Sequence, residues 1–129
     1  MTLSPWQSDP DIKAALSEKT IAVVGLSGNP ARPSHDVAKV MLQHGYTIVP
    51  VNPREKRVLG VDCYPDLPTA AAEAGPLALV NVFRESSAVP AIAKEAVSIG
   101  ARFLWLQLGV FSPCGIRIAE AEGLTCIVD

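Results

Sequence analysis

Residues 20–34, Thr-Ile-Ala-Val-Val-Gly-Leu-Ser-Gly-Asn-Pro-Ala-Arg-Pro-Ser, decide the fold that the sequence predicts. A short β-branched apolar run, typical of a buried strand, ends at Gly25. A loop rich in Gly, Ser, Asn and Pro follows and carries Arg32, and Ser34 then opens an amphipathic helical pattern. A strand, a glycine turn and a helix N-terminus in this order are the arrangement with which α/β proteins hold phosphate, because backbone N–H groups and the helix dipole favour an anion there.

The composition fits one domain with a substantial core. The chain has 129 residues, 49% of them hydrophobic but only 5% aromatic, so Val, Ala, Leu and Ile must fill the core, as in buried parallel strands. A net charge of −2 argues against a nucleic-acid-binding protein held by bulk charge. No apolar run approaches the ~20 residues that span a bilayer, and the N-terminus does not resemble a signal peptide. We expect a single cytoplasmic domain over residues 1–129 that binds neither nucleic acid nor membrane, with a homo-oligomer or a protein partner left open.

Strands alternate with short helices along the chain. Strands are predicted at 20–24, 46–51, 77–83, 102–106 and 124–128, and helices at 9–18, 34–44, 67–74, 86–99 and 113–122. We expect Asp9 to cap the first helix, Ser86 or Ser87 to cap the fourth, and a short extra strand near Cys63 and Tyr64. The alternation predicts an α/β fold of three layers, a mostly parallel sheet with helices on both faces.

Ligands of such folds bind beyond the carboxyl ends of the strands, at the point where the strand order reverses. This rule brings the loops 25–34, 52–57, 83–87 and 107–113 to one rim. The first loop offers as candidate binding residues Gly25, Ser27, Gly28, Asn29, Arg32 and Ser34. Serine and asparagine side chains can donate to phosphate oxygens, and arginine presents a planar fork to them. The glycine spacing is not the dinucleotide fingerprint, because the third glycine is missing.

The second loop, Val51-Asn52-Pro53-Arg54, separates the possible nucleotides. NAD-binding proteins place Asp or Glu here to bind the ribose hydroxyls, whereas this chain has Asn52 followed by Arg54, Lys56 and Arg57. A cluster of cations suits a phosphate on the ribose. The pattern therefore excludes simple NAD and leaves NADP or coenzyme A, whose adenosine carries a 3′-phosphate.

The third and fourth loops add one cation, one aromatic ring and one amide. Arg84 can reach a phosphate, and Phe83 either packs in the core or forms an apolar wall against the ligand. Gln107 follows the fourth long strand and can hydrogen-bond a ligand, while Trp105 is expected in the core.

Together these segments resemble the small coenzyme A-binding domain proteins, single Rossmann-like domains related to the nucleotide-binding half of the succinyl-CoA synthetase α subunit. The resemblance covers residues 10–129, and its markers are residues 21–27 with 32–34, 49–53, 81–84 and 104–109. It implies that coenzyme A or an acyl-CoA lies across the strand ends. The resemblance implies that Gly25, Ser27 and Asn29, with Arg32 nearby, hold the pyrophosphate, and that Val51, Pro53 and Arg54 meet the adenosine and its phosphate. It further implies that Val82, Phe83 and Arg84 border the middle of the ligand and that Gln107 faces the pantetheine arm.

Two departures from the family bear on activity. Such proteins commonly continue past the last strand with an Asp-Arg-Cys-type turn, whereas the sequence ends at Asp129, so that element is absent or lies beyond the sequence given. The related ligases also use a second domain that carries a phosphorylated histidine, for which 129 residues leave no room.

No set of nucleophile, base and orienting group stands out in the sequence. Cys63, Cys114 and Cys126 lack metal-ligand spacing and are expected to be reduced thiols, although Cys114 opens a predicted helix on the same rim. We therefore expect non-catalytic binding of coenzyme A or an acyl-CoA, with no metal site. The alternatives are an NADP-binding reductase-like domain, and a regulatory or scaffolding domain with a vestigial nucleotide pocket.

Overall fold

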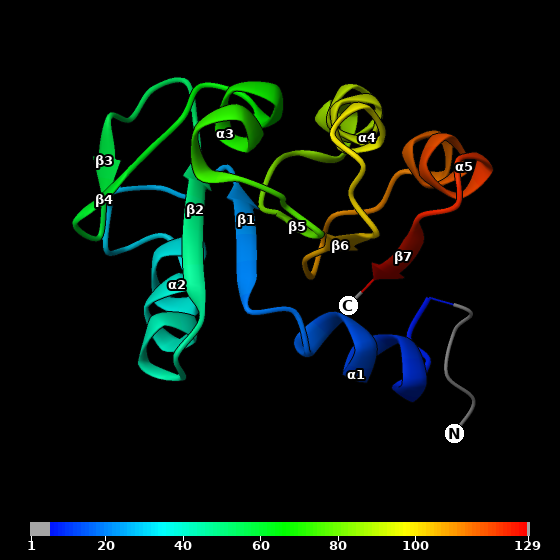
Figure 1. Cartoon of the computed structure of the whole chain (residues 1–129), viewed down its shortest axis with the longest axis horizontal. Helices are drawn as coiled ribbons and strands as arrows, with labels where there is room; N and C mark the ends of the chain where they lie inside the picture. Colours follow the sequence, from blue (N-terminus) through cyan, green and yellow to red (C-terminus); the bar gives the residue numbers. More distant parts are fainter. Residues whose placement is uncertain (1–5, 129) are drawn as a thin grey trace.

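The computed structural model describes residues 6–128, in which five parallel strands form a sheet between two layers of helices (Figure 1). The strands are β1 (Thr20–Val24), β2 (Thr47–Val51), β5 (Leu79–Val82), β6 (Phe103–Leu106) and β7 (Thr125–Val128). One face is covered by α3 (Leu67–Ala74), α4 (Val89–Ser98) and α5 (Pro113–Ala121), and the other by α1 (Asp9–Leu16) and α2 (Pro33–Gln43). The predicted three-layer α/β fold is confirmed. Residues 1–5 and 129, which the predicted domain includes, lie outside the described residues.

The strand order is β2-β1-β5-β6-β7, and all neighbours in this sheet are parallel. The chain moves from β1 outward to β2 and then returns to the other side of β1 to form β5. The strand order therefore reverses between β1 and β5, and the loops that follow these two strands leave their carboxyl ends in different directions.

A small hairpin follows β2, made of β3 (Arg57–Val58) and β4 (Val61–Asp62). The short extra strand expected near Cys63 and Tyr64 is therefore found as β4, which ends one residue before Cys63. Tyr64 makes only an isolated bridge to Val51, because the short hairpin closes before it.

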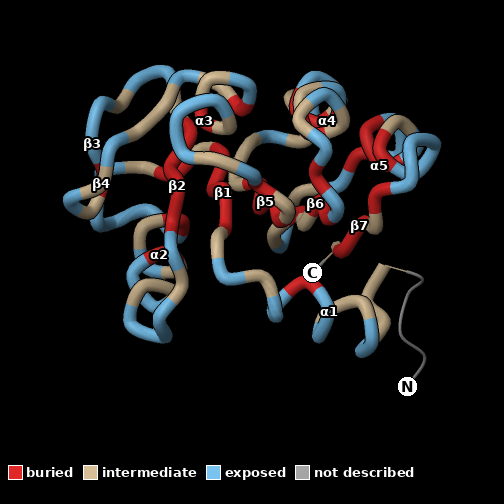
Figure 2. Tube along the Cα trace, in the orientation of Figure 1, coloured by how far each residue is buried: buried red, intermediate tan, exposed pale blue. Residues whose placement is uncertain are grey.

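Both faces of the sheet are buried, as Figure 2 shows for the central strands. In β1, Ala22 and Val24 belong to the core cluster that includes residues of α3, α4 and α5, whereas Ile21 and Val23 belong to the cluster that includes Ala15 of α1 and residues of α2. Strands buried on both sides read as nearly continuous apolar runs, which is why the sequence predicted a parallel sheet.

The helices differ from the prediction mainly at their ends. Ser8, rather than Asp9, caps α1 by accepting a hydrogen bond from the Asp11 N–H, and the helix ends at Leu16 instead of residue 18. Ser86 opens a short 3₁₀ turn, η1 (Ser86–Ala88), and its Oγ accepts the Phe111 N–H at 3.0 Å, so neither Ser86 nor its neighbour caps α4 as predicted. None of the five helices within residues 6–128 has the length and apolar content that crossing a bilayer requires.

Candidate functional site

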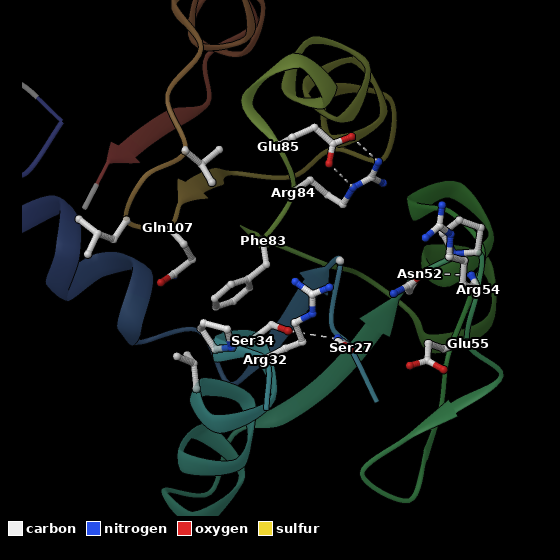
Figure 3. Close-up of a pocket in the computed structure, with 16 residues that line it drawn as sticks. Ser27, Arg32, Ser34, Asn52, Arg54, Glu55, Phe83, Arg84, Glu85 and Gln107 are labelled. Atoms are coloured by element: carbon white, nitrogen blue, oxygen red, sulfur yellow. Dashed lines mark hydrogen bonds and ion pairs between the residues drawn. The ribbon is translucent and has the colours of Figure 1, made fainter. Parts of the chain in front are cut away.

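A groove of about 960 Å³ lies at the carboxyl ends of the strands, across the point where the strand order reverses. The four loops that the sequence places on one rim all contribute to it. Figure 3 shows Arg54 and Gln107 toward opposite ends, with Arg32, Phe83 and Arg84 between them. The predicted site residues that line the groove are Gly25, Ser27, Arg32, Ser34, Asn52, Pro53, Arg54, Phe83, Arg84 and Gln107.

Four predicted residues lie beside the groove and do not line it. Val51 and Val82 are buried at the strand ends and belong to the core beneath the groove. Gly28 and Asn29 form the exposed outer part of the first loop. Gly28 nevertheless contacts a residue that lines the groove, as described below.

Gly25 directly follows β1 and lies against the ends of β2 and β5. Its N–H donates to the carbonyl of Val51 at 2.8 Å, and the Phe83 N–H donates to the carbonyl of Val24, also at 2.8 Å. Gly25 has a φ of +86°, and a Cβ at this position would lie 2.5 Å from the Phe83 carbonyl oxygen and 2.9 Å from Cδ of Arg84. Only glycine allows both the left-handed conformation and this close approach.

The rest of the first loop is held by its own polar side chains. The Ser27 N–H donates to Oγ of the buried Ser34, the Asn29 N–H donates to Oγ of Ser27, and the Ala31 N–H donates to Oδ1 of Asn29, at distances of 2.9 to 3.1 Å. Sequence reasoning assigned Ser27 and Asn29 to the ligand. In the structure their side-chain oxygens close the turns of the loop, so both residues fix the shape of the loop from within.

The second loop is tied to the first by Asn52. Its Nδ2 donates to the Leu26 carbonyl at 3.1 Å, and its Oδ1 accepts the Arg54 N–H at 3.0 Å. Of the three cations that the sequence groups here, Arg54 lines the groove. Arg57 instead pairs with Asp62 across the β3–β4 hairpin at 2.7 Å, and Lys56 is exposed outside the groove lining of the described chain. Of the predicted cluster of three cations, one arginine thus lines the groove.

The second loop also supplies an acid that the sequence reasoning overlooked. The half-buried carboxylate of Glu55 lines the groove and accepts the N–H of Gly28 from the first loop. The prediction for residues 54–57 considered only their positively charged side chains and so left Glu55 out. Its position three residues after Asn52, in the loop where NAD proteins carry an acid, was the available signal.

The third loop presents Arg84 paired with its neighbour Glu85. Their side chains form two hydrogen bonds, of 2.9 and 3.2 Å, and both residues line the groove. The hydrogen bond from Arg84 lowers the pKa of Glu85 to about 2. An exposed pair of this kind contributes little to stability, so a phosphate can replace the carboxylate on Arg84 at small cost.

The Gln107 end of the groove combines one amide with apolar side chains. Nε2 of Gln107 donates to Oδ1 of Asn81 at 2.6 Å, which leaves the amide oxygen of Gln107 to accept a hydrogen bond from a ligand. Asn81 is 2% exposed in the middle of β5 and was not among the predicted site residues, although a polar residue within an apolar strand is a signal. Phe83, Leu108 and Val110 provide the apolar lining of this end.

The cysteines and histidines lie outside the groove lining of residues 6–128. Cys114 is exposed at the start of α5, and Cys126 is buried, which raises the pKa of its thiol to about 12. Within the same residues no three side chains of His, Cys, Asp or Glu gather as a metal site would require.

Similarity to known proteins identifies the family of this chain. A sequence family described as a CoA binding domain matches residues 19–129. The chain belongs to the CoA binding domain family. The resemblance drawn from the four sequence segments is therefore confirmed.

Members and relatives of the CoA binding domain family range from single domains to large ligases. The uncharacterized protein YneT of Bacillus subtilis is 40% identical over 123 residues, which cover 95% of this chain and 89% of YneT. An ADP-forming acetate–CoA ligase of Archaeoglobus fulgidus is 28% identical over 88% of this chain, which spans only 17% of the ligase. The solved structure of a hypothetical protein from Pyrococcus horikoshii, 29% identical, superposes with a TM-score of 0.90 over 100% of this chain and 92% of that one.

Proposed function

We propose that the groove binds coenzyme A or an acyl-CoA and that this chain acts as a binding module without catalysis of its own. The observation that carries the proposal is the distribution of polarity along the groove. Arg32, Arg54 and Arg84 line it on one side of Phe83, and Gln107 lies on the other (Figure 3). The apolar residues Leu108 and Val110, which also line the groove, directly follow Gln107 in the chain. Coenzyme A has the same polarity, since its phosphates are at the adenosine end and its pantetheine arm carries the thiol or acyl group.

Individual groups of the ligand can be matched to the groove on this basis. Arg54 is placed for the 3′-phosphate of the adenosine, and Arg32 and Arg84 for the pyrophosphate. The amide oxygen of Gln107 suits an amide N–H of the pantetheine arm, because Asn81 already holds its Nε2. The exposed Leu108 offers an apolar surface to an acyl chain.

The composition of the lining supports binding without catalysis. Over residues 6–128 the lining holds no histidine, cysteine or lysine. Its two serines lie on the first loop and at the start of α2, where the Ser34 oxygen is engaged by the Ser27 N–H. A nucleophile needs a base within hydrogen-bond reach, and neither serine has a histidine partner in this lining.

Calorimetric titration with coenzyme A, dephospho-coenzyme A and NADP tests the proposal. We expect coenzyme A to bind, dephospho-coenzyme A to bind about tenfold more weakly because one charge-assisted contact is lost, and Arg54→Ala to remove that difference. Arg57→Ala is the matched control, because Arg57 is a neighbouring arginine paired with Asp62 outside the groove. A preference for NADP would support the reductase-like alternative, and no binding of any of the three would support a vestigial pocket.

We also propose a cytoplasmic location. Cys63, Cys114 and Cys126 are all free thiols, which is the usual state of cysteines in a reducing compartment. Fractionation of cells that express the tagged full-length protein checks this.

A further inference from the structure

We infer that Glu55 competes with a ligand phosphate for the N–H of Gly28 and thereby limits the affinity of the groove for anions. The inference rests on the proposed function, because the Glu55 carboxylate would compete with the phosphates of the ligand proposed above. Its starting point is the hydrogen bond that joins the first and second loops, from the Gly28 N–H to the Glu55 carboxylate.

The Gly28 N–H differs from the other donors of its loop. The N–H groups of Ser27, Asn29 and Ala31 donate to side chains of the loop or the start of α2, and the Arg32 N–H donates to the Asn29 carbonyl. These bonds are local and build the turns. The acceptor for Gly28 comes instead from a flexible side chain 27 residues further along the chain. An incoming anion can therefore take this donor without breaking a turn of the loop.

The Glu55 carboxylate lies directly against Gly28. A Cβ there would lie 2.6 Å from Oε2 of Glu55. The second loop itself is fixed, because Asn52 binds the Leu26 carbonyl and accepts the Arg54 N–H. Rotation of the Glu55 side chain alone would free the Gly28 N–H while Arg54 stays in place.

The chemistry makes the two acceptors exclusive. A carboxylate oxygen and a phosphate oxygen are both anionic acceptors for a backbone N–H, and like charges that share one donor repel each other. Three arginines attract anions to the groove, whereas Glu55 and Glu85 oppose them. Glu85 and Arg84 form an ion pair at 2.9 Å, so these two charges largely offset each other. Glu55 forms no ion pair within 4.0 Å among the described residues, so no direct partner offsets its repulsion of an anion at Gly28.

Two variants and one control test the inference. Glu55→Gln removes the charge but keeps an oxygen for the Gly28 N–H, Glu55→Ala removes both, and Glu73→Gln changes an exposed acid on α3, outside the groove. Each protein is titrated by calorimetry with inorganic pyrophosphate and with coenzyme A. We expect Glu55→Gln to bind both about threefold to tenfold more tightly than the unsubstituted protein, Glu55→Ala to gain at least as much, and Glu73→Gln to gain nothing.

The two probes separate this inference from the proposed function. If coenzyme A does not bind but pyrophosphate binds more tightly to both Glu55 variants, the proposed ligand is wrong and the role of Glu55 stands. If coenzyme A binds and neither variant gains affinity for it or for pyrophosphate, the ligand stands and the inference is overturned. Failure of pyrophosphate to bind any of the proteins also overturns it. The Gly28 amide signal in a ¹⁵N–¹H spectrum gives a direct readout, since pyrophosphate should shift it in every protein.

Discussion

Replacing Gly25 by alanine tests whether the groove depends on the close approach of β1 to β5. The new methyl group would have two separate effects. The φ of +86° is unfavourable for alanine, at a cost of about 1 to 2 kcal/mol. The Cβ would also lie 2.5 Å from the Phe83 carbonyl oxygen, a backbone atom that can move only if the chain directly after β5 shifts. Forced overpacking of this kind adds about 1 to 3 kcal/mol, so the expected loss is about 2 to 5 kcal/mol in the free energy of unfolding.

Gly45→Ala is a matched control that separates the two effects. Gly45 has a φ of +88°, close to that of Gly25, but no atom lies within 4 Å of the position its Cβ would take. This variant should lose only the conformational part, about 1 to 2 kcal/mol. Any effect of alanine on the unfolded chain is the same in both variants and cancels in the difference.

Urea denaturation followed by far-ultraviolet circular dichroism measures both variants under the same conditions. We expect Gly25→Ala to be less stable than Gly45→Ala by at least about 1 kcal/mol, with unchanged dependence on urea. Gly25→Ala should also bind coenzyme A more weakly, because Phe83 and Arg84 must shift to admit the methyl group. Equal stability of the two variants would refute the reasoning, since the contact with Phe83 would then not be what requires glycine.

The thiols and the Glu85 carboxyl give two further predictions. With a thiol reagent at pH 8, the exposed Cys114 should react rapidly and the half-buried Cys63 more slowly. Cys126 should react only on unfolding, because burial raises the pKa of its thiol to about 12. Rapid reaction of Cys126 in the folded protein would contradict its burial. In a carbon-13 titration Glu85 should remain ionised at pH 3, because its pKa is about 2 instead of 4.5, and Arg84→Met should return the midpoint toward the ordinary value. Since the pKa is lowered in the folded state, the stabilising effect of this pair is present above about pH 4.5 and is lost as the pH falls toward 2.

The sequence predicted the fold well because the signals of the main elements are local. Apolar runs such as 20–24 and helices closed by glycine, as at Gly45 and Gly123, reveal strands and helices one at a time. The rule for ligand sites in parallel sheets then predicted, from the sequence alone, that the four loops lie on one rim. Short pairings carry too few residues for such a pattern, which is why the strand at 57–58 was not predicted and the one at 61–62 was expected slightly later, near residues 63–64.

The site was predicted less completely, because its details depend on contacts between loops. Nothing local shows that Glu55 reaches Gly28, that Arg57 turns away to Asp62, or that Gln107 is held by Asn81. Each of these hydrogen bonds involves a side chain whose partner is set by the folded chain. Most of the residues that line the groove could be named from the sequence, but not the hydrogen bonds that some of them make with one another.

The hydrogen bonds within the first loop have a consequence for the kinetics of association. Because Ser27, Asn29 and Ser34 close its turns, the loop is already ordered in the folded protein. Binding of a ligand would therefore cost little further conformational entropy in this loop. A ligand would then meet a surface that is already shaped, and its rate of capture would be set by diffusion and by the attraction of the arginines. Differences in affinity among related ligands should accordingly arise from how long each one stays bound.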